Sequence, residues 1–252
     1  MKREEKNKIR TLGIGTWISA GSPVITEMIS MMGFDWLLFD LEHGFMQEHD
    51  VLSNLMAVKD KNTKVIVRVG EFRGGLIARL LDWGASGIMM PHVCRAEEAA
   101  ALVESMCYPP YGKRGFSASS RSFGYGFHTV NDMTEWEPPL CIAQIENYEG
   151  VKNAPSIAAV EGVDMLFIGP RDLRLDLSVR KDINERIAFT DALERTAKAA
   201  VASGKQGGIL VSPGEDISGL QKMGFSAFAI GSDLAVLRSG YKKIMKSERL
   251  PD

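Results

Sequence analysis

Two short apolar runs in the middle of the chain end in carboxylates, and these carboxylates are the residues best suited to chemistry. One run ends in Gln144-Ile145-Glu146-Asn147 and the other is Phe167-Ile168-Gly169-Pro170-Arg171-Asp172, with a helix-like segment at 148–162 between them. If the two runs are parallel neighbouring strands, Glu146 and Asp172 project into one cleft. Two convergent carboxylates suit a hard cation such as Mg²⁺ or Mn²⁺ and leave positions open for substrate and water. The alternative is that one carboxylate caps the next helix while the other is solvated.

The elements that must position these residues alternate along the chain between strand-like and helix-like segments. The predicted strands are Gly13–Ile18, Trp36–Asp40, Val65–Val69, Gly87–Val93, Leu140–Glu146, Met165–Ile168, Gly207–Val211 and Ala227–Ile230. The predicted helices are 22–32, 48–59, 73–83, 96–106, 148–162, 189–203, 217–223 and 233–246. Short apolar strands with helix-length crossovers indicate a parallel sheet, and eight such units in 252 residues fit a closed (β/α)8 barrel. A doubly wound open sheet is the alternative, but no glycine-rich phosphate-binding turn follows the first strand.

The whole chain, 1–252, is therefore expected to be one domain. Residues 1–12 form an extension before the first strand, and 233–252 hold the last helix. Two stretches interrupt the alternation: a long loop at 108–139, rich in Gly, Ser, Pro and aromatic residues, and a charged loop at 171–184. Long irregular connections inside a compact domain are usually functional or disordered, and the aromatic residues favour an ordered loop.

Composition narrows the classes of partner and compartment. The formal net charge is −2, so no nucleic-acid or membrane partner is expected. The basic residues of the first ten positions are not followed by the apolar stretch of a signal peptide, and no apolar run has the length of a membrane span. The three cysteines have no metal-ligand spacing, which is typical of reduced thiols in a cytoplasmic protein.

In a barrel of this kind the chemistry lies at the carboxyl ends of the strands. The polar, glycine and proline residues at those ends are Asp40, Glu42, His43, Arg68, His92, Gln144, Glu146, Asn147, Gly169, Pro170, Arg171, Asp172, Ser212, Gly231 and Ser232. They include no cysteine nucleophile, and they include no lysine that could form an imine with a carbonyl substrate. Metal-assisted acid–base chemistry is the simplest remaining reading.

Six motifs in order give the chain a resemblance to the HpcH/HpaI aldolases, a family of metal-dependent class II pyruvate aldolases. The resemblance extends from about Gly13 to Ser232. The motifs are Asp40-Leu41-Glu42-His43-Gly44, Val67-Arg68-Val69, Leu81-Asp82-Trp83-Gly84-Ala85, Tyr108-Pro109-Pro110-Tyr111-Gly112-Lys113-Arg114-Gly115, Gln144-Ile145-Glu146-Asn147 and Phe167-Ile168-Gly169-Pro170-Arg171-Asp172-Leu173.

The resemblance implies a role for each matched residue. Glu146 and Asp172 match the metal carboxylates of the family, and Gln144 matches a glutamine beside the metal and the substrate. Arg68 matches an arginine that contacts the keto oxygen, and His43 matches the catalytic histidine.

Further residues complete the expected site. Asp82 matches an aspartate that pairs with the catalytic histidine of a neighbouring subunit, so we count it with His43 and Arg68 as catalytic. Backbone amides around Arg171 and Asp172 are expected to hold the substrate carboxylate. The expected substrate-binding set is Arg68, Gln144, Gly169, Pro170, Arg171, Asp172 and Ser212.

The implied fold is a (β/α)8 barrel of the phosphoenolpyruvate/pyruvate type, with the last helix, within 233–252, exchanged between the subunits of a hexamer or dimer. The implied cofactor is a divalent metal, Mg²⁺, Mn²⁺ or Co²⁺. The implied substrates are a 2-oxo acid, pyruvate or oxaloacetate, and an aldehyde acceptor. Cleaving the carbon–carbon bond of a 4-hydroxy-2-oxo acid leaves a pyruvate enolate, whose charged keto oxygen faces the metal and Arg68, while His43 takes the proton of the aldol hydroxyl.

Two other functions remain open at this point. One is a citrate-synthase-like or citramalyl-type carbon–carbon lyase on the same barrel. The other is a non-catalytic barrel that binds a small acid, against which the joint presence of Glu146, Asp172, Arg68 and His43 argues.

Several of these residues also have a purely structural explanation. Arg68 in an apolar strand requires a buried anion. That anion is either the substrate or a carboxylate of the protein that forms a structural ion pair with Arg68. Asp82 at a helix end is by default a solvated carboxylate, and Glu42 either contacts a water near the metal or only hydrogen-bonds the barrel rim. His92 and His128 are interpreted as structural or rim residues.

The remaining charges concern the acceptor. Glu104, Lys113 and Arg114 are interpreted as surface charges, and the alternative for Arg114 is contact with an acidic substrate tail. Arg171 and Arg174 are departures from the family pattern, and they favour a more acidic acceptor or else form salt bridges between subunits. The loop 115–125, rich in hydroxyl groups, is expected to cover the acceptor.

Overall fold

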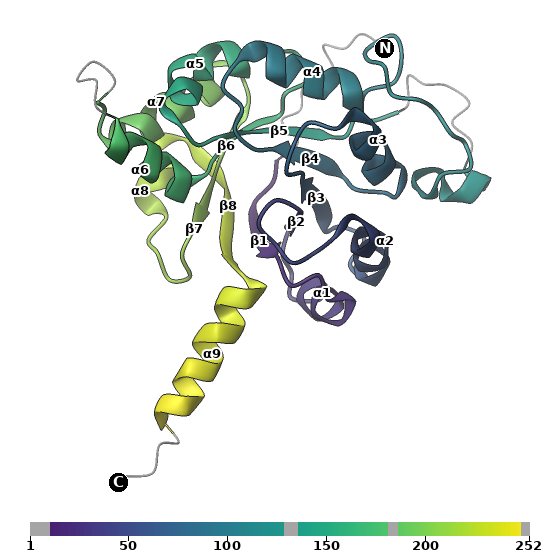
Figure 1. The fold of residues 1–252 in the computed structure, drawn as a ribbon, viewed down its shortest axis with the longest axis horizontal. Coiled ribbons are helices and arrows are strands. Elements are labelled where there is room, and N and C mark those ends of the chain that lie inside the picture. Colours follow the sequence, from purple (N-terminus) through teal and green to yellow (C-terminus); the bar gives the residue numbers. More distant parts are fainter. Residues whose placement is uncertain (1–10, 129–135, 181–185, 248–252) are drawn as a thin grey trace.

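The computed structural model describes residues 11–128, 136–180 and 186–247 and shows a closed parallel barrel (Figure 1). Its strands follow one another around the barrel in chain order, and β8 pairs with β1. They are β1 (Ile14–Ile18), β2 (Trp36–Asp40), β3 (Lys64–Arg68), β4 (Gly87–Met90), β5 (Leu140–Ile145), β6 (Met165–Ile168), β7 (Gln206–Val211) and β8 (Phe225–Ser232). The predicted (β/α)8 barrel is confirmed, and the open sheet is excluded because β1 pairs with both β2 and β8.

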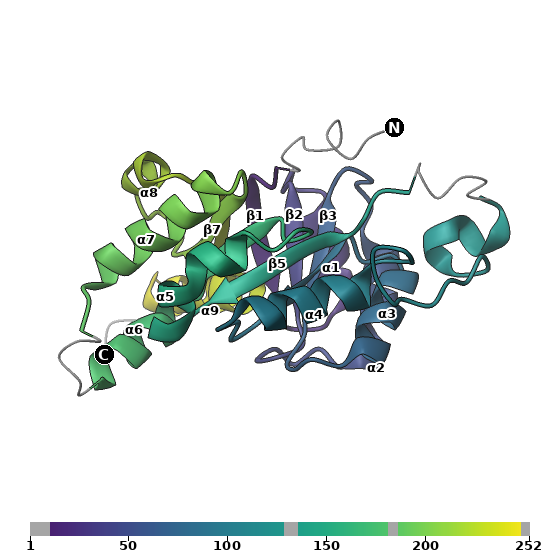
Figure 2. The same cartoon turned by 90° about the horizontal axis from the view of Figure 1, so that it is seen from above.

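The helices, apart from the last, lie around the outside of the barrel (Figure 2). They are α1 (Pro23–Ser30), α2 (Glu48–Ala57), α3 (Gly74–Asp82), α4 (Ala96–Met106), α5 (Tyr148–Ala158), α6 (Pro170–Val179), α7 (Phe189–Ala202), α8 (Ser218–Met223) and α9 (Asp233–Ser247), with a 3₁₀ segment, η2 (Arg121–Gly126).

The predicted charged loop at 171–184 is wrong over most of its length, because α6 occupies 170–179. Pro170 lies at the first helical position, where its missing N–H costs nothing, and Asp172 lies in the first turn, where it complements the helix dipole. Leu173 is buried and Leu177, four residues on, packs against the same core. Residues 181–184 of the predicted loop lie outside the described residues.

Two apolar layers hold the barrel together. Trp36 and Leu38 of β2 pack inside the barrel, whereas Leu37 and Phe39 pack toward the helices. The strands are therefore apolar on both faces, which explains their continuous apolar runs. Inside, the rings of Trp36 and Phe167 meet edge to face with centroids 6.1 Å apart.

The same alternation places the polar residues of the site. Side chains two apart on a strand share a face, so Asp40 follows Leu38 into the barrel and Arg68 follows Ile66. Gln144 follows Ile142 in the same way, and Glu146 comes next on that face. The inward-facing strand positions thus change from apolar to polar or charged near the carboxyl ends of the strands. The layer of side chains at that end of the barrel is therefore polar.

The described part of the long connection, 108–128 and 136–139, has an aromatic cluster of its own. Tyr108 packs on Phe116 and Trp136, with ring centroids 5.5 and 4.7 Å apart, and Phe116 packs on Phe123 at 5.2 Å. Arg121 donates a hydrogen bond to the carbonyl oxygen of Trp83 at 2.7 Å. These contacts fix the connection against the end of α3.

The last helix, α9, extends away from the barrel (Figure 1). Its start is fixed because the buried carboxylate of Asp233 accepts hydrogen bonds from the N–H groups of Ser19 and Ala20 at 3.0 and 2.9 Å. Beyond that point it exposes the apolar side chains Leu234, Val236, Leu237, Tyr241, Ile244 and Met245. Within the described residues, no helix has the length and apolar character needed to cross a membrane.

Candidate active site

A buried guanidinium lies between two carboxylates at the ends of β2 and β3. Asp40 and Arg68 are paired in the strand register, and Arg68 Nε and Nη2 donate to the two carboxylate oxygens of Asp40 at 2.9 and 2.8 Å. The third nitrogen, Nη1, lies 2.8 Å from Glu42 Oε2, and the guanidinium stacks on the ring of Trp17 at 4.2 Å. Arg68 therefore forms a structural ion pair, and the same contacts hold its guanidinium group in one orientation.

Glu146 is the most buried carboxylate of the site and has hydrogen-bond donors on both oxygens. Its Oε2 accepts a hydrogen bond from Gln144 Nε2 at 2.8 Å, and its Oε1 accepts one from the backbone N–H of His92 at 2.8 Å. His92 Nδ1 lies 3.0 Å from the same Oε1. The other end of the buried Gln144 amide, Oε1, has no hydrogen-bond partner among the residues that the structure describes.

Burial raises the pKa of Glu146 above its ordinary value, and the negative charges of Glu42 and Asp172 also raise this pKa, against the opposing effect of His92. Carboxylates that share a buried site repel one another, and a bound cation relieves both the repulsion and the burial cost.

Asp172 lies at the end of the strand next to that of Glu146. The strands β5 and β6 are parallel neighbours, with Gln144 opposite Phe167 and Ile145 opposite Ile168. Asp172 is half-buried in the first turn of α6, directly after β6, and its charge acts on Glu146. The two predicted metal carboxylates therefore follow neighbouring strands, whereas the ligand atoms that lie within 4.8 Å of one another are those of Glu42, His92 and Glu146.

Gly169 makes room for this group. A β-carbon at Gly169 would collide with the carboxylate of Glu146 and would lie 2.7 Å from Gln144 Nε2. Its N–H donates to the carbonyl oxygen of Ile145 at 3.1 Å, which ties the start of α6 to β5. The absence of a side chain at Gly169 thus lets β5 and the first turn of α6 approach closely.

His43 lies at the rim, in the loop after β2. Its backbone N–H donates to Asp40 Oδ1 at 3.3 Å, so the carboxylate that holds Arg68 also positions this turn. Its ring is 65% exposed, with Nε2 3.8 Å from Glu42 Oε1. An exposed imidazole at the mouth of the site is accessible to substrate.

Asp82 lies apart from the residues at the carboxyl ends of the strands. It ends α3, and its carboxylate accepts a hydrogen bond from Arg114 Nη2 at 2.6 Å. Arg114 is buried and stacks on Tyr108, so the expectation of a surface charge is wrong for Arg114, whereas Lys113 does pair with Glu104 at the surface.

The position of the Asp82–Arg114 pair in the barrel follows from a cavity of about 510 Å³ that Arg114 lines. The cavity is lined by Leu81 and Arg114 together with Leu12, Lys64 and Leu140, which precede or begin strands. Asp82 is therefore at the amino-terminal end of the barrel, away from His43 of the same chain. The expected pairing between Asp82 and His43 requires a second copy and stays a prediction.

The outer substrate-binding candidates are peripheral. Ser212 is exposed, and its N–H donates to Glu215 Oε2 at 2.9 Å. Arg171 is exposed on α6, and Arg174 stacks on the ring of Phe189 at 3.5 Å. Pro170 starts α6.

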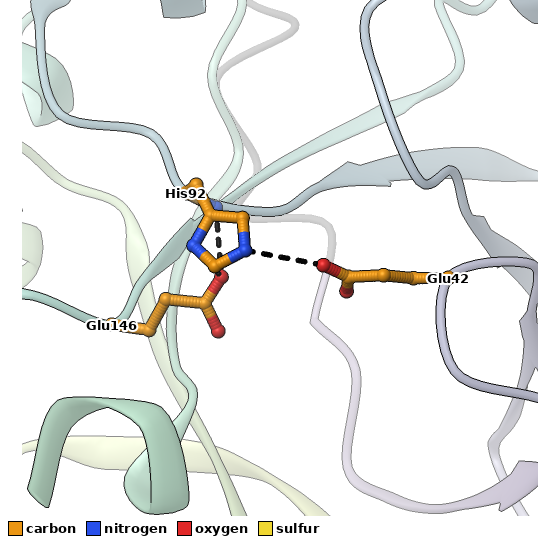
Figure 3. A group of neighbouring side chains, drawn as sticks. All are labelled: Glu42, His92 and Glu146. Carbon is orange, nitrogen blue, oxygen red and sulfur yellow. Dashed lines mark hydrogen bonds and ion pairs between the residues drawn. The ribbon is translucent and has the colours of Figure 1, made fainter. Parts of the chain in front are cut away.

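His92 lies at the rim, as the sequence indicates, with its side chain 58% exposed, and its ring also contacts the carboxylates of the site. Its ring is between two carboxylates: Nε2 lies 3.3 Å from Glu42 Oε1, and Nδ1 faces Glu146 (Figure 3). The predicted strand 87–93 ends early, at Met90, and His92 takes a positive φ of 54° in the turn that follows. The Pro91-His92 sequence at a strand end was the available signal.

The donors suit a divalent cation. Ligand atoms of Glu42, His92 and Glu146 all lie within 4.8 Å of one another, and Asp172 is close enough for its charge to act on Glu146. Carboxylate oxygens and imidazole nitrogen are ligands for such ions. The unpartnered Oε1 of Gln144 adds a buried polar atom beside Glu146.

The carboxyl ends of the strands are where (β/α)8 barrel enzymes carry their active sites, and this polar site lies there. The sequence profile described as HpcH/HpaI aldolase/citrate lyase matches residues 13–240, and the chain belongs to that family. It is a carbon–carbon lyase of the class II aldolase type, as the sequence predicts. Aldolases of this class generally depend on a divalent metal.

Known relatives cover nearly the whole chain. The 5-keto-4-deoxy-D-glucarate aldolase of Enterobacter sp. (strain 638) is 36% identical over 240 residues, which cover 94% of this chain and 93% of the relative. A solved HpcH/HpaI aldolase/citrate lyase family protein from Burkholderia cenocepacia J2315 has a TM-score of 0.84 at 28% identity, covering 98% of this chain and 100% of that one. The citrate synthase SbnG has a TM-score of 0.79 at 26% identity, covering 97% and 95%.

Proposed function

We propose that this enzyme cleaves a 4-hydroxy-2-oxo acid to pyruvate and an aldehyde, with a divalent cation held by Glu146 and Asp172. The observation that carries the proposal is the arrangement at the ends of β5 and β6. There, a buried Glu146 with a raised pKa lies beside Gln144 and within the electrostatic reach of Asp172. A divalent cation supplies Lewis-acid stabilisation of the negative charge that develops on a keto oxygen.

Arg68 provides the second positive charge. Asp40 holds two of its nitrogens and Glu42 the third, so the guanidinium does not have to reorganise when charge develops in front of it. Preorganised charge of this kind lowers a barrier more than a mobile side chain does, because the cost of ordering it is met during folding. Gln144 adds an amide beside Glu146 that orients that carboxylate.

His43 is the proposed base. Cleavage of an aldol requires removal of the proton from the 4-hydroxyl group while the bond between carbons 3 and 4 breaks. His43 is exposed at the mouth, on the turn that Asp40 fixes. In the reverse direction the same imidazole returns the proton to the alkoxide oxygen of the new aldol.

The curated relatives point to an acidic substrate. The substrate in their name, 5-keto-4-deoxy-D-glucarate, has a carboxylate at each end. Retro-aldol cleavage of this diacid gives pyruvate and a three-carbon aldehyde that keeps one carboxylate. Arg171, exposed on α6 one residue before Asp172, is a cation suited to that carboxylate. We therefore propose a dicarboxylic 4-hydroxy-2-oxo acid as the substrate.

The second candidate function is a citrate-synthase-like condensation that uses oxaloacetate as the acceptor. The fold similarity to citrate synthase SbnG favours keeping it. It uses the enolate of a thioester-bound acetyl group in place of the pyruvate enolate. Addition of that enolate to oxaloacetate and hydrolysis of the thioester give citrate and a free thiol, so the product formed separates the two functions.

We further propose that the enzyme is a homo-oligomer in which α9 packs on a second copy. The helix exposes a row of apolar side chains, and α1 exposes Val24, Met28, Met31 and Met32. Exposed apolar surface of this extent marks an association site. An assembly of this kind is also what the proposed pairing of Asp82 with the His43 of a neighbour requires.

The test is pyruvate release from 5-keto-4-deoxy-D-glucarate, coupled to lactate dehydrogenase and NADH. We expect activity that EDTA removes and that Mg²⁺, Mn²⁺ or Co²⁺ restores. Glu146→Gln should be inactive, whereas Glu149→Gln, a change on the surface of α5, should behave as wild type. Pyruvate release indifferent to EDTA would refute the metal assignment. Citrate formation from oxaloacetate and an acetyl thioester, without cleavage of the diacid, would favour the second candidate.

A further inference from the structure

His92 is set apart from the other three histidines of the chain by its surroundings. It is the histidine whose ring bridges carboxylates from two different strand ends, Glu42 after β2 and Glu146 after β5 (Figure 3). Its backbone adopts φ 54°, so that its N–H and its ring both face Glu146. Non-glycine residues rarely take this conformation, and they keep it where the surroundings enforce it.

The two ring nitrogens have different neighbours. Nδ1 lies 3.0 Å from Glu146 Oε1. Two ligand atoms on adjacent vertices of an octahedron with bonds of about 2.1 Å lie about 3 Å apart, so this pair has the spacing of two ligands of one cation. Nε2 lies 3.3 Å from Glu42 Oε1, and the other oxygen of Glu42 pairs with Arg68.

We propose that His92 is a third protein ligand of the bound cation, through Nδ1, and that Glu42 orients its ring through Nε2. The inference rests on the proposed metal site of Glu146 and Asp172 and deepens it. A metal-ligating histidine commonly donates its other N–H to a carboxylate, which fixes its tautomer and direction. Here that carboxylate also holds Arg68, so one side chain links the cation to the guanidinium.

This ligand has a consequence for the choice of metal. Imidazole nitrogen suits transition metals, whereas Mg²⁺ prefers oxygen ligands and keeps its waters. The site with His92 is therefore selective for Mn²⁺ and Co²⁺ over Mg²⁺, and removal of the imidazole reduces that selectivity.

The experiment uses metal binding and not turnover. Full-length metal-free protein is titrated with Mn²⁺, Co²⁺ and Mg²⁺ by calorimetry, for wild type, His92→Phe and His49→Phe. His49 is 81% exposed on α2 and serves as the matched control. We expect His92→Phe to weaken Co²⁺ and Mn²⁺ binding by roughly 10- to 100-fold and Mg²⁺ binding by less, with no change in the control.

A spectroscopic readout on the wild type makes the test independent of how well the variant folds. Pulsed electron paramagnetic resonance of the Mn²⁺ complex should show coupling to an imidazole ¹⁴N, and His92→Phe should lose it. Unchanged or tighter Mn²⁺ binding in His92→Phe would overturn the inference, and so would the absence of ¹⁴N coupling in the wild type. Either result would mean that the imidazole contacts Glu146 in the metal-free protein but does not bind the cation. Failure of the wild type to bind any of the three metals would instead refute the proposed metal site itself.

Discussion

At the scale of single residues, Arg68 is the side chain whose geometry is most constrained. It has contacts from two buried carboxylates and a stacked indole. Lysine has the same charge but cannot satisfy both oxygens of Asp40 and reach Glu42. We expect Arg68→Lys to lower kcat for pyruvate release by roughly 100-fold, in line with the loss of one preorganised donor.

The same change should lower the free energy of unfolding by about 1–3 kcal/mol, because buried carboxylate oxygens lose their partners. Arg79→Lys, at an exposed pair with Glu48, is the control for both urea unfolding and kcat, and it should have little effect. A wild-type kcat in Arg68→Lys would show that Arg68 is only structural.

Gly169 gives a second residue-scale prediction. Alanine at this position places a methyl group against the carboxylate of Glu146 and the amide of Gln144. We expect Gly169→Ala to weaken Mn²⁺ binding by about 10-fold, as disturbed outer contacts of a metal site do. Gly219→Ala in α8 is the control, because a β-carbon there meets nothing within 4 Å. Equal Mn²⁺ affinity in Gly169→Ala and wild type would mean that Glu146 has room to shift.

Some of these residue-scale features were predictable and others were not. The placement of Glu146 and Asp172 after two parallel neighbouring strands follows from the pattern of strand and helix. The place of His92 depends on a positive φ and on a contact across the barrel to Glu42, neither of which leaves a periodic signal. Arg114 was misread for the same reason, because its partner Asp82 is 32 residues away.

At the scale of elements, α6 must dock correctly because it bears Asp172. Its Asp176 accepts hydrogen bonds from the N–H of Tyr148 at 2.8 Å and from Arg180, which joins α6 to the start of α5. Burial acts to raise the pKa of Asp176, but the hydrogen bonds from Arg180 and Tyr148 outweigh it, and the pKa is lowered overall.

The lowered pKa predicts a pH-dependent stability contribution. The folded pKa lies below the unfolded value of about 3.9, so the contribution is complete above that value and is lost as the pH falls through the folded pKa. We expect Asp176→Asn to cost about 1 kcal/mol at pH 7 by urea unfolding, with the difference from wild type shrinking below about pH 4. Glu194→Gln, at the exposed pair with Lys198 on α7, should cost less than about 0.5 kcal/mol. A cost for Asp176→Asn that grows toward acid pH would contradict this account.

Element type was predictable where periodicity was strong. The β2 run Trp36-Leu37-Leu38-Phe39 is buried on both faces and could only be a core strand or a core helix, and its length decided for strand. The start signals of α6, Pro170 and Asp172, are present in the sequence, but the many charges of the segment are equally typical of a loop.

At the scale of the whole molecule, α9 is the feature that a single copy does not explain. Leu237 and Tyr241 are one helical turn apart and exposed. We expect the double substitution Leu237→Asp and Tyr241→Asp to convert the oligomer to a smaller species by light scattering after size exclusion. Lys242→Glu, at a polar position of the same helix, is the control. A wild-type protein that is already monomeric would contradict the proposed exchange.

The central claim is that the site forms a pyruvate enolate with the help of a divalent cation held by Glu146. The most direct measurement is exchange of the methyl protons of pyruvate in D₂O, followed by proton NMR, because it needs no acceptor. The account predicts that the methyl signal decays with enzyme and Mn²⁺ or Mg²⁺ and persists with EDTA or with Glu146→Gln. Exchange that continues in Glu146→Gln at the wild-type rate, or no exchange with any metal, would contradict it.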